Sequence, residues 1–111
     1  MRAELIINGR PVDTTIIVAD GKINNISFKY KVEKSCWAAI RIWGSAHSNP
    51  VFITVGGKPV VEKRSAQWCL DALEQCWKMK EPNIRESEKA DAKKSYDAAR
   101  EVYRKIIAAA D

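Results

Sequence analysis

A change in residue character near Lys63 constrains the fold of this chain more than any other feature of its sequence. Before that point the chain is rich in β-branched residues and in turn signals, and after it few of either occur. β-branched residues between closely spaced turns favour strands, whereas apolar residues at helical spacing favour amphipathic helices. The sequence therefore predicts a strand region over residues 1–62 and a helical region over residues 63–111.

The chain has 111 residues, of which 46% are hydrophobic and 30% are charged, so its composition is that of one globular domain spanning residues 1–111. Its apolar runs are only a few residues long, whereas a membrane-spanning helix needs about 20. The first residues lack the pattern of a secretory signal. We expect no membrane segment, and the compartment stays undetermined.

Turn signals divide the first region into strands. Residues 5–7 end at an Asn-Gly pair, Asn8-Gly9, which is typical of a tight hairpin turn. Further strands are expected at 14–19, at 26–32, where apolar and polar residues alternate, at 36–43, at 51–55 and around 59–61, with a polar loop over 44–50. Residues 36–43 are apolar on both alternating faces, so we expect a second sheet on one face and helices on the other.

Two amphipathic helices follow. Ser65 is the expected N-cap of the first, which ends by Pro82, and Asn83 with Glu86 resembles a capping box for the second. The apolar stripes are Ala66, Cys69, Leu70, Leu73 and Trp77 in the first helix, and Ala92, Tyr96, Ala99, Tyr103, Ile106 and Ala110 in the second. Glu101 and Lys105 have the spacing of a surface ion pair. A short link predicts an antiparallel helical hairpin.

The net charge of +5 raises the question of an anionic partner. The basic residues are scattered and accompany no nucleic-acid-binding motif, so we expect a solvated surface and no nucleic acid. Three separated cysteines favour thiols buried as small hydrophobic groups. A zinc site from these cysteines and His47 is the alternative, although its ligands lack the usual close spacing.

Aromatic and polar residues leave several readings open. The four tryptophans favour core packing over stacking platforms for a sugar or a base, with Trp37, Trp68 and Trp77 mostly buried and Trp43 partly exposed. His47 lies in a polar loop beside serines, which allows a catalytic role, a hydrogen bond within the loop, or a contact with a partner. No base and orienting group accompany it in the sequence, so catalysis is the weakest of the three.

Several segments together resemble the C-terminal region of CehA/McbA-type metallohydrolases, of the polymerase-and-histidinol-phosphatase (PHP) superfamily. They are residues 8–15 (NGRPVDTT), 35–42 (SCWAAIRI), 45–52 (SAHSNPVF), 64–70 (RSAQWCL) and 74–77 (EQCW). The likeness covers nearly the whole chain. It implies a parent enzyme whose catalytic domain binds divalent metals through clustered histidines and acids and hydrolyses ester, amide or phosphate bonds.

A single histidine cannot supply such a cluster, so no catalytic, metal or cofactor residue of the family transfers to this chain. The resemblance therefore implies a noncatalytic accessory domain that stabilises or positions the catalytic domain of its own parent chain, with Met1 beginning an excised fragment. His47, Asn49 and Trp43 are the expected interdomain contacts.

The predicted fold is α+β: a small antiparallel, immunoglobulin-like β-sandwich followed by a helical hairpin packed on it. Two other functions stay open. One is a free-standing binding module for a carbohydrate or a protein, which sandwich folds often are. The other is an independent small hydrolase, which would need an enclosed cleft around His47. A homo-oligomer is also left open.

Overall fold

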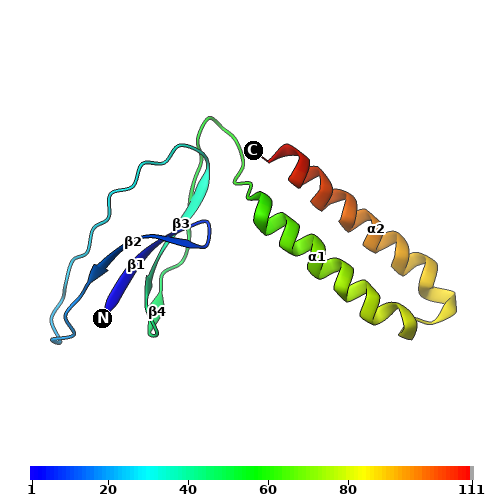
Figure 1. Cartoon of the computed structure of the whole chain (residues 1–111), viewed down its shortest axis with the longest axis horizontal. Coiled ribbons are helices and arrows are strands. Elements are labelled where there is room, and N and C mark those ends of the chain that lie inside the picture. The colour runs from blue at the N-terminus through cyan, green and yellow to red at the C-terminus, as the bar shows by residue number, and fades with distance from the viewer. Residues whose placement is uncertain (111) are drawn as a thin grey trace. The chain divides into compact units, whose positions relative to one another are not determined.

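The chain has α+β architecture, as the sequence predicts. The computed structural model describes residues 1–110. An antiparallel sheet is followed by two helices that form a hairpin (Figure 1). The chain divides into two compact units, one ending at Val60 and the other beginning at Val61. This division lies close to the predicted boundary between residues 62 and 63.

The sheet contains five strands, with the order β2-β1-β3 and with β4 and β5 both paired to the other edge of β3. The strands are β1 (Arg2–Ile7), β2 (Arg10–Ile16), β3 (Cys36–Ile42), β4 (Ala46–His47) and β5 (Val51–Ile53). Every pair is antiparallel. Within residues 1–110 these strands form a single sheet, so the predicted two-sheet sandwich is not confirmed.

The first hairpin forms as predicted at its Asn-Gly turn. Asn8 and Gly9 have φ angles of 48° and 84°, the positive values that a two-residue turn of this hand requires. A two-residue turn fixes the start of the returning strand, so β2 begins at Arg10 and ends at Ile16 instead of spanning 14–19. The pairing register shifts between Leu5 and Ile6 of β1, because Val12 is an extra residue in β2, which marks a bulge in that strand.

The predicted strand at 26–32 is wrong, because these residues form no ladder. Ile26, Phe28 and Val32 are half-buried while Ser27, Lys29 and Lys31 are exposed, but Tyr30 of the same apolar set is 48% exposed, so the expected alternation of burial holds only in part. Residues 24–27 border a recess together with residues 15–18 of the hairpin. An extended segment can bury alternate side chains without sheet hydrogen bonds, which is why this pattern indicates extended chain and does not prove pairing.

Two smaller predictions in this region also need correction. No strand forms at 59–61, where Pro59 lacks the N–H that a ladder uses. The expected loop at 44–50 contains the short strand β4, and β5 ends at Ile53 rather than at 55. Ser35 closes this part of the chain: Val55 N donates to its Oγ at 2.8 Å, and that hydroxyl donates to the Lys58 carbonyl at 2.7 Å.

The core of the sheet unit lies around the two central strands. Ala3, Ile6, Ile7 and Cys36 are its buried apolar residues. β1 and β3 each have a neighbour on both edges, and their facing residues place Glu4 and Ile6 of β1 beside Arg41 and Ala39 of β3 on one face. We call this side, which also carries Trp37, the pocket face. Ala3, Leu5 and Ile7 lie on the opposite face.

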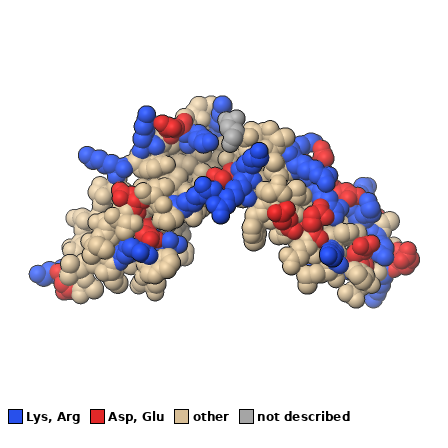
Figure 2. Space-filling view, viewed as in Figure 1, with Lys and Arg blue, Asp and Glu red and all other residues tan. Residues whose placement is uncertain are grey.

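The helical unit consists of α1 (Lys63–Lys80), a short 3₁₀ turn η1 (Glu81–Asn83) and α2 (Glu86–Ala109). The stripe residues of both helices are buried or half-buried, which confirms the predicted amphipathic hairpin. Trp77 of α1 packs against Tyr96 of α2 with ring centroids 4.9 Å apart. Glu101 and Lys105 form the predicted ion pair at 3.8 Å. On the face seen in Figure 2, acidic and basic side chains are interspersed over the hairpin.

Both predicted N-caps are wrong. The cap of α1 is Glu62, so Ser65 lies within the first turn, and the cap of α2 is Arg85, which places Asn83 in the 3₁₀ turn. Neither cap residue makes a side-chain capping bond. Glu86 lies in the first turn of α2, where a carboxylate interacts favourably with the helix dipole. The charge near this terminus therefore takes the place of a capping box.

The tryptophans and cysteines follow the predictions in part. Trp43 is 57% exposed, as expected for a residue beside a loop, but Trp68 is 71% exposed, which contradicts its predicted burial. Trp37 and Trp77 are half-buried. All three cysteines are free thiols, with Cys36 buried and Cys69 and Cys76 half-buried.

Candidate functional site

A recess of about 480 Å³ opens on the pocket face of the sheet. Residues from β1, the first turn, β3, and the β4–β5 segment line it: Ile6, Gly9, Trp37, Ala39, Ile40, Arg41, His47, Ser48, Asn49, Pro50 and Phe52. Apolar groups dominate this lining, and polar groups come mainly from the loop after β4. Its size and chemistry suit a binding site for an apolar group with a few polar neighbours. We call this recess the sheet pocket.

Two aromatic side chains form the apolar part of the sheet pocket. Trp37 of β3 and Phe52 of β5 are directly opposite each other in the ladder, which brings their side chains onto the same face. Trp37 is half-buried, whereas Phe52 is 68% exposed. An aromatic ring left this exposed at the mouth of an apolar recess is available to an incoming apolar group.

The Asn-Gly turn holds Trp37 in place. Asn8 Oδ1 accepts a hydrogen bond from Trp37 N at 3.0 Å, and Asn8 N donates to the Trp37 carbonyl at 3.1 Å. Gly9 lies against the indole ring, since a Cβ at this position would meet Trp37 Cζ2 at 3.8 Å. The same turn that closes the hairpin therefore also fixes one wall of the sheet pocket.

The rim of the sheet pocket is held by hydrogen bonds of the loop after β4. Ser48 Oγ accepts from Ile40 N at 2.9 Å and donates to the Asn49 carbonyl at 3.0 Å. His47 Nδ1 lies 3.1 Å from the Ser48 carbonyl. A carbonyl can only accept, so Nδ1 is the donor in this bond. Thus His47 makes the hydrogen bond within the loop that the sequence allowed.

A charged cluster adjoins the sheet pocket. Glu4 is only 4% exposed and accepts hydrogen bonds from Arg41 Nε at 2.8 Å and Nη2 at 2.5 Å. Arg2 Nε lies 3.1 Å from the other Glu4 oxygen. Both guanidinium groups stack on Trp43, with Cζ to ring-centroid distances of 5.0 Å for Arg2 and 4.8 Å for Arg41. We call these four residues the arginine cluster.

The three predicted contact residues thus fall into two neighbouring places. His47 and Asn49 line the sheet pocket, whereas Trp43 belongs to the arginine cluster. Arg41 joins the two, because it lines the pocket and also stacks on Trp43. The sequence reasoning missed Phe52 and Arg41 and placed Trp37 in the core. Only the ladder register, which the sequence does not give, shows that Trp37 and Phe52 are paired.

The arrangement suits binding more than reaction chemistry. Ser48 Oγ is engaged by the backbone, and the nearest partner of His47 is a backbone carbonyl. A hydroxyl nucleophile next to a base and an orienting carboxylate is not formed by these two residues. Within residues 1–110 no three His, Cys, Asp or Glu side chains lie close enough together to hold a metal ion. None of the helices in that span is long and apolar enough to cross a bilayer.

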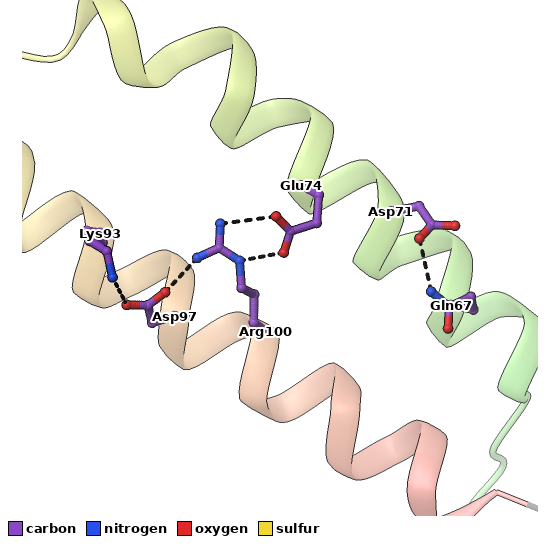
Figure 3. A network of polar contacts seen from close by, with 6 residues as sticks. All are labelled: Gln67, Asp71, Glu74, Lys93, Asp97 and Arg100. Atoms are coloured by element: carbon purple, nitrogen blue, oxygen red, sulfur yellow. Dashed lines mark hydrogen bonds and ion pairs between the residues drawn. The ribbon is translucent and has the colours of Figure 1, made fainter.

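A second polar network joins the two helices (Figure 3). Arg100 of α2 donates to Glu74 of α1 through Nε at 2.5 Å and Nη2 at 3.3 Å, and to Asp97 through Nη1 at 2.6 Å. The bond to Glu74 raises the pKa of Arg100. The pKa of Asp97 is lowered, chiefly by its hydrogen bond from Lys93 and further by Arg100. Because Arg100 of α2 is paired with Glu74 of α1, the network holds the two helices of the hairpin together.

The same helix seam carries a thiol and a phenol in contact. Cys76 Sγ and Tyr96 Oη lie 3.2 Å apart. This hydrogen bond, together with burial, raises the pKa of Tyr96. A phenol is already neutral near pH 7, and a raised pKa makes ionisation still less favourable, so this contact suits packing.

Comparison of the chain with models of protein families, with curated proteins and with solved structures finds no match. The resemblance to PHP-type hydrolases is therefore a matter of the sequence motifs alone, and none of these comparisons supports it. The structure adds the positions of those motifs. Every residue that lines the sheet pocket, except Ile6, comes from the motif segments 8–15, 35–42 and 45–52.

Proposed function

We propose that this chain is a noncatalytic accessory domain of a PHP-type metal-dependent hydrolase, and that it binds the catalytic domain of its parent protein through the sheet pocket. The observation that carries the proposal is the convergence of three motif segments on one recess. Segment 8–15, which contributes Gly9, is separated from the neighbouring segments 35–42 and 45–52 by residues 16–34, and the three together supply all of the pocket lining except Ile6. Motif segments that meet at one recess support a shared contact there, whereas the two other motif segments, 64–70 and 74–77, lie in α1.

The chemistry of the recess supports a partner contact over catalysis. Phe52 and Trp43 are more than half exposed, and exposed aromatic groups beside an arginine are typical of the anchors of protein interfaces. His47 and Asn49, two of the expected interdomain contacts, stand at the rim. The accessory domain would hold the catalytic domain in position and leave the metal chemistry to it.

Three measurements on the purified chain test this proposal: its metal content, its hydrolytic activity and its binding of the catalytic domain. The chain alone should carry no stoichiometric zinc, manganese or iron and should not hydrolyse ester or phosphate substrates. It should bind the separately expressed catalytic domain of the parent enzyme in a titration followed by calorimetry. Turnover by the chain alone, or absence of binding to the catalytic domain, would contradict the accessory role.

The free-standing binding module is the second candidate, and one observation favours it. Trp37 and Phe52 lie side by side at a recess whose rim carries Asn49 and His47, a combination that also suits a sugar ring. Titration with cellotetraose and mannotetraose, followed by tryptophan fluorescence, distinguishes the two candidates. Saturable sugar binding at the sheet pocket would favour the module, and its absence would favour the accessory domain.

A further inference from the structure

The arginine cluster places an unbalanced positive charge beside the sheet pocket. Arg2 and Arg41 share a single carboxylate, Glu4, so the three side chains together carry one net positive charge. Glu4 is 4% exposed, and burial of a carboxylate this deep requires close cationic partners. The excess charge is thus a consequence of how the cluster is built.

Arg41 brings this charge to the pocket. Its Nε and Nη2 atoms are fixed by Glu4, and its guanidinium plane rests on Trp43 at 4.8 Å. Its side chain is still 39% exposed, and it lines the sheet pocket. A guanidinium held on two sides by hydrogen bonds and stacking loses little freedom when it binds an anion. His47, opposite Arg41 in the ladder, stands beside it at the same rim.

The sheet unit as a whole has the same sign of charge. Residues 1–60 contain eight Lys and Arg against four Asp and Glu, a net charge of +4. An approaching surface of opposite charge is therefore favoured over a basic one. The occupant of the sheet pocket should combine an apolar side chain, to contact Trp37 and Phe52, with a neighbouring carboxylate, to meet Arg41.

We infer that the sheet pocket recognises a segment of the partner catalytic domain in which an apolar side chain stands next to Asp or Glu, with Arg41 as the residue that selects the carboxylate. This inference rests on the proposed function and names the chemistry of its partner surface. Trp37 and Phe52 provide contact area, and Arg41 provides the choice between an acid and its neutral isostere.

The test compares two blocked dipeptides, acetyl-Leu-Glu-amide and acetyl-Leu-Gln-amide, by NMR titration of the whole chain. The acidic peptide should bind about fivefold more tightly than the neutral one, with shifts at Trp37 and Phe52, and added salt should reduce this ratio. Equal affinities, or shifts confined to α1 and α2, would overturn the inference. This comparison needs no variant, so it does not depend on whether a substituted chain folds.

Two variants that each lose one positive charge show whether Arg41 is the residue that selects the acidic peptide. Arg41→Gln should bring the ratio of the two affinities close to one, and Lys29→Gln, an exposed change in the same unit, should leave it as it is. A ratio unchanged in a folded Arg41→Gln protein would overturn the role of Arg41. If phenylacetate binds more tightly than the acidic peptide, the occupant is a small carboxylate and the inference is wrong.

The proposed function and this inference fail in different ways. If the catalytic domain binds the chain but both peptides bind equally, the accessory role is supported. The inference that the sheet pocket recognises an acidic segment is then wrong. If the acidic peptide is preferred but the catalytic domain does not bind, the pocket chemistry is supported and the accessory role is contradicted.

Discussion

Glu4 shows how much of the sheet unit depends on one side chain. It is a carboxylate on the central strand β1, 4% exposed, and both of its neighbours in the arginine cluster are cations. Removing its charge leaves Arg2 and Arg41 close together without a counter-ion. Burial of the carboxylate is costly in itself, and the partners compensate for that cost only while all three are present.

We therefore predict that Glu4→Gln lowers the free energy of unfolding by about 2 kcal/mol, because charge-assisted hydrogen bonds to a buried acceptor are lost. Urea unfolding followed by circular dichroism measures this change. The matched control is Glu33→Gln, which removes a carboxylate from an ion pair whose side chains are 87% and 75% exposed. That substitution should cost less than about 0.5 kcal/mol. Equal effects would contradict the account.

Asn8 has two roles that can be separated by substitution. Its φ angle of 48° suits the turn, and its Oδ1 accepts from Trp37 N. Asn8→Gly keeps the turn geometry and removes the acceptor, so we predict a loss of about 1 kcal/mol in unfolding free energy. Asn8→Asp keeps the acceptor and should be less costly. If Asn8→Gly is as stable as the unsubstituted chain, the hydrogen bond to Trp37 contributes nothing to the free energy of unfolding.

Among the elements, we expect the helical hairpin to depend on pH through Asp97. The pKa of Asp97 lies below the ordinary value of about 3.9, chiefly because Lys93 donates to the carboxylate and also because Arg100 does. A group with a lowered folded pKa stabilises the fold above its unfolded pKa, and this contribution disappears as the pH falls through the folded pKa. The network should therefore weaken only in acid.

We predict that Asp97→Asn lowers the melting temperature at pH 7. The difference in melting temperature between this variant and the unsubstituted chain should disappear as the pH is lowered below about 4. Thermal unfolding at several pH values from neutral to strongly acid measures this gap. Glu101→Gln, at an exposed ion pair of the same helix, serves as the control and should change little. A gap that stays constant down to the lowest pH would show that Asp97 does not stabilise through its charge.

The elements also show what sequence reasoning can and cannot provide. Helical stripes, the Asn8-Gly9 turn and the strand at Cys36 follow from local spacing, and all are found. The strand predicted at 26–32 is not found, because alternation of apolar and polar residues indicates which side chains are buried and not which backbones pair. The helix caps fail because neither helix begins with a side-chain cap, so Ser65 and Asn83 give misleading signals.

The candidate site was predictable only in part for a similar reason. His47 and Asn49 stand out as polar residues in a loop between strands, and both line the sheet pocket. Trp37 and Phe52 become neighbours only through the pairing of β3 with β5. Arg41 is a charged residue in an otherwise apolar strand, and its partner Glu4 lies in a different strand. Long-range register, which local patterns do not specify, decides these contacts.

At the scale of the whole molecule, we propose that the chain is a binding domain. The sheet unit carries the sheet pocket and a net charge of +4, whereas the helical hairpin carries interspersed charges and packed apolar stripes. A self-associating chain would bury its exposed aromatic groups against a second copy instead of a catalytic domain. Sedimentation equilibrium distinguishes these cases, and we expect a monomer that associates only when the catalytic domain is added.

The most direct test is calorimetric titration of the separately expressed catalytic domain into this chain and into two variants. Phe52→Ser removes an apolar group of the sheet pocket that is 68% exposed, and Ile16→Ser removes one of similar exposure, 72%, from strand β2 outside the pocket lining. We predict that the unsubstituted chain binds the catalytic domain, that Phe52→Ser binds it at least about tenfold more weakly, and that Ile16→Ser binds it as tightly as the unsubstituted chain does. Equal affinities for the two variants would contradict this prediction.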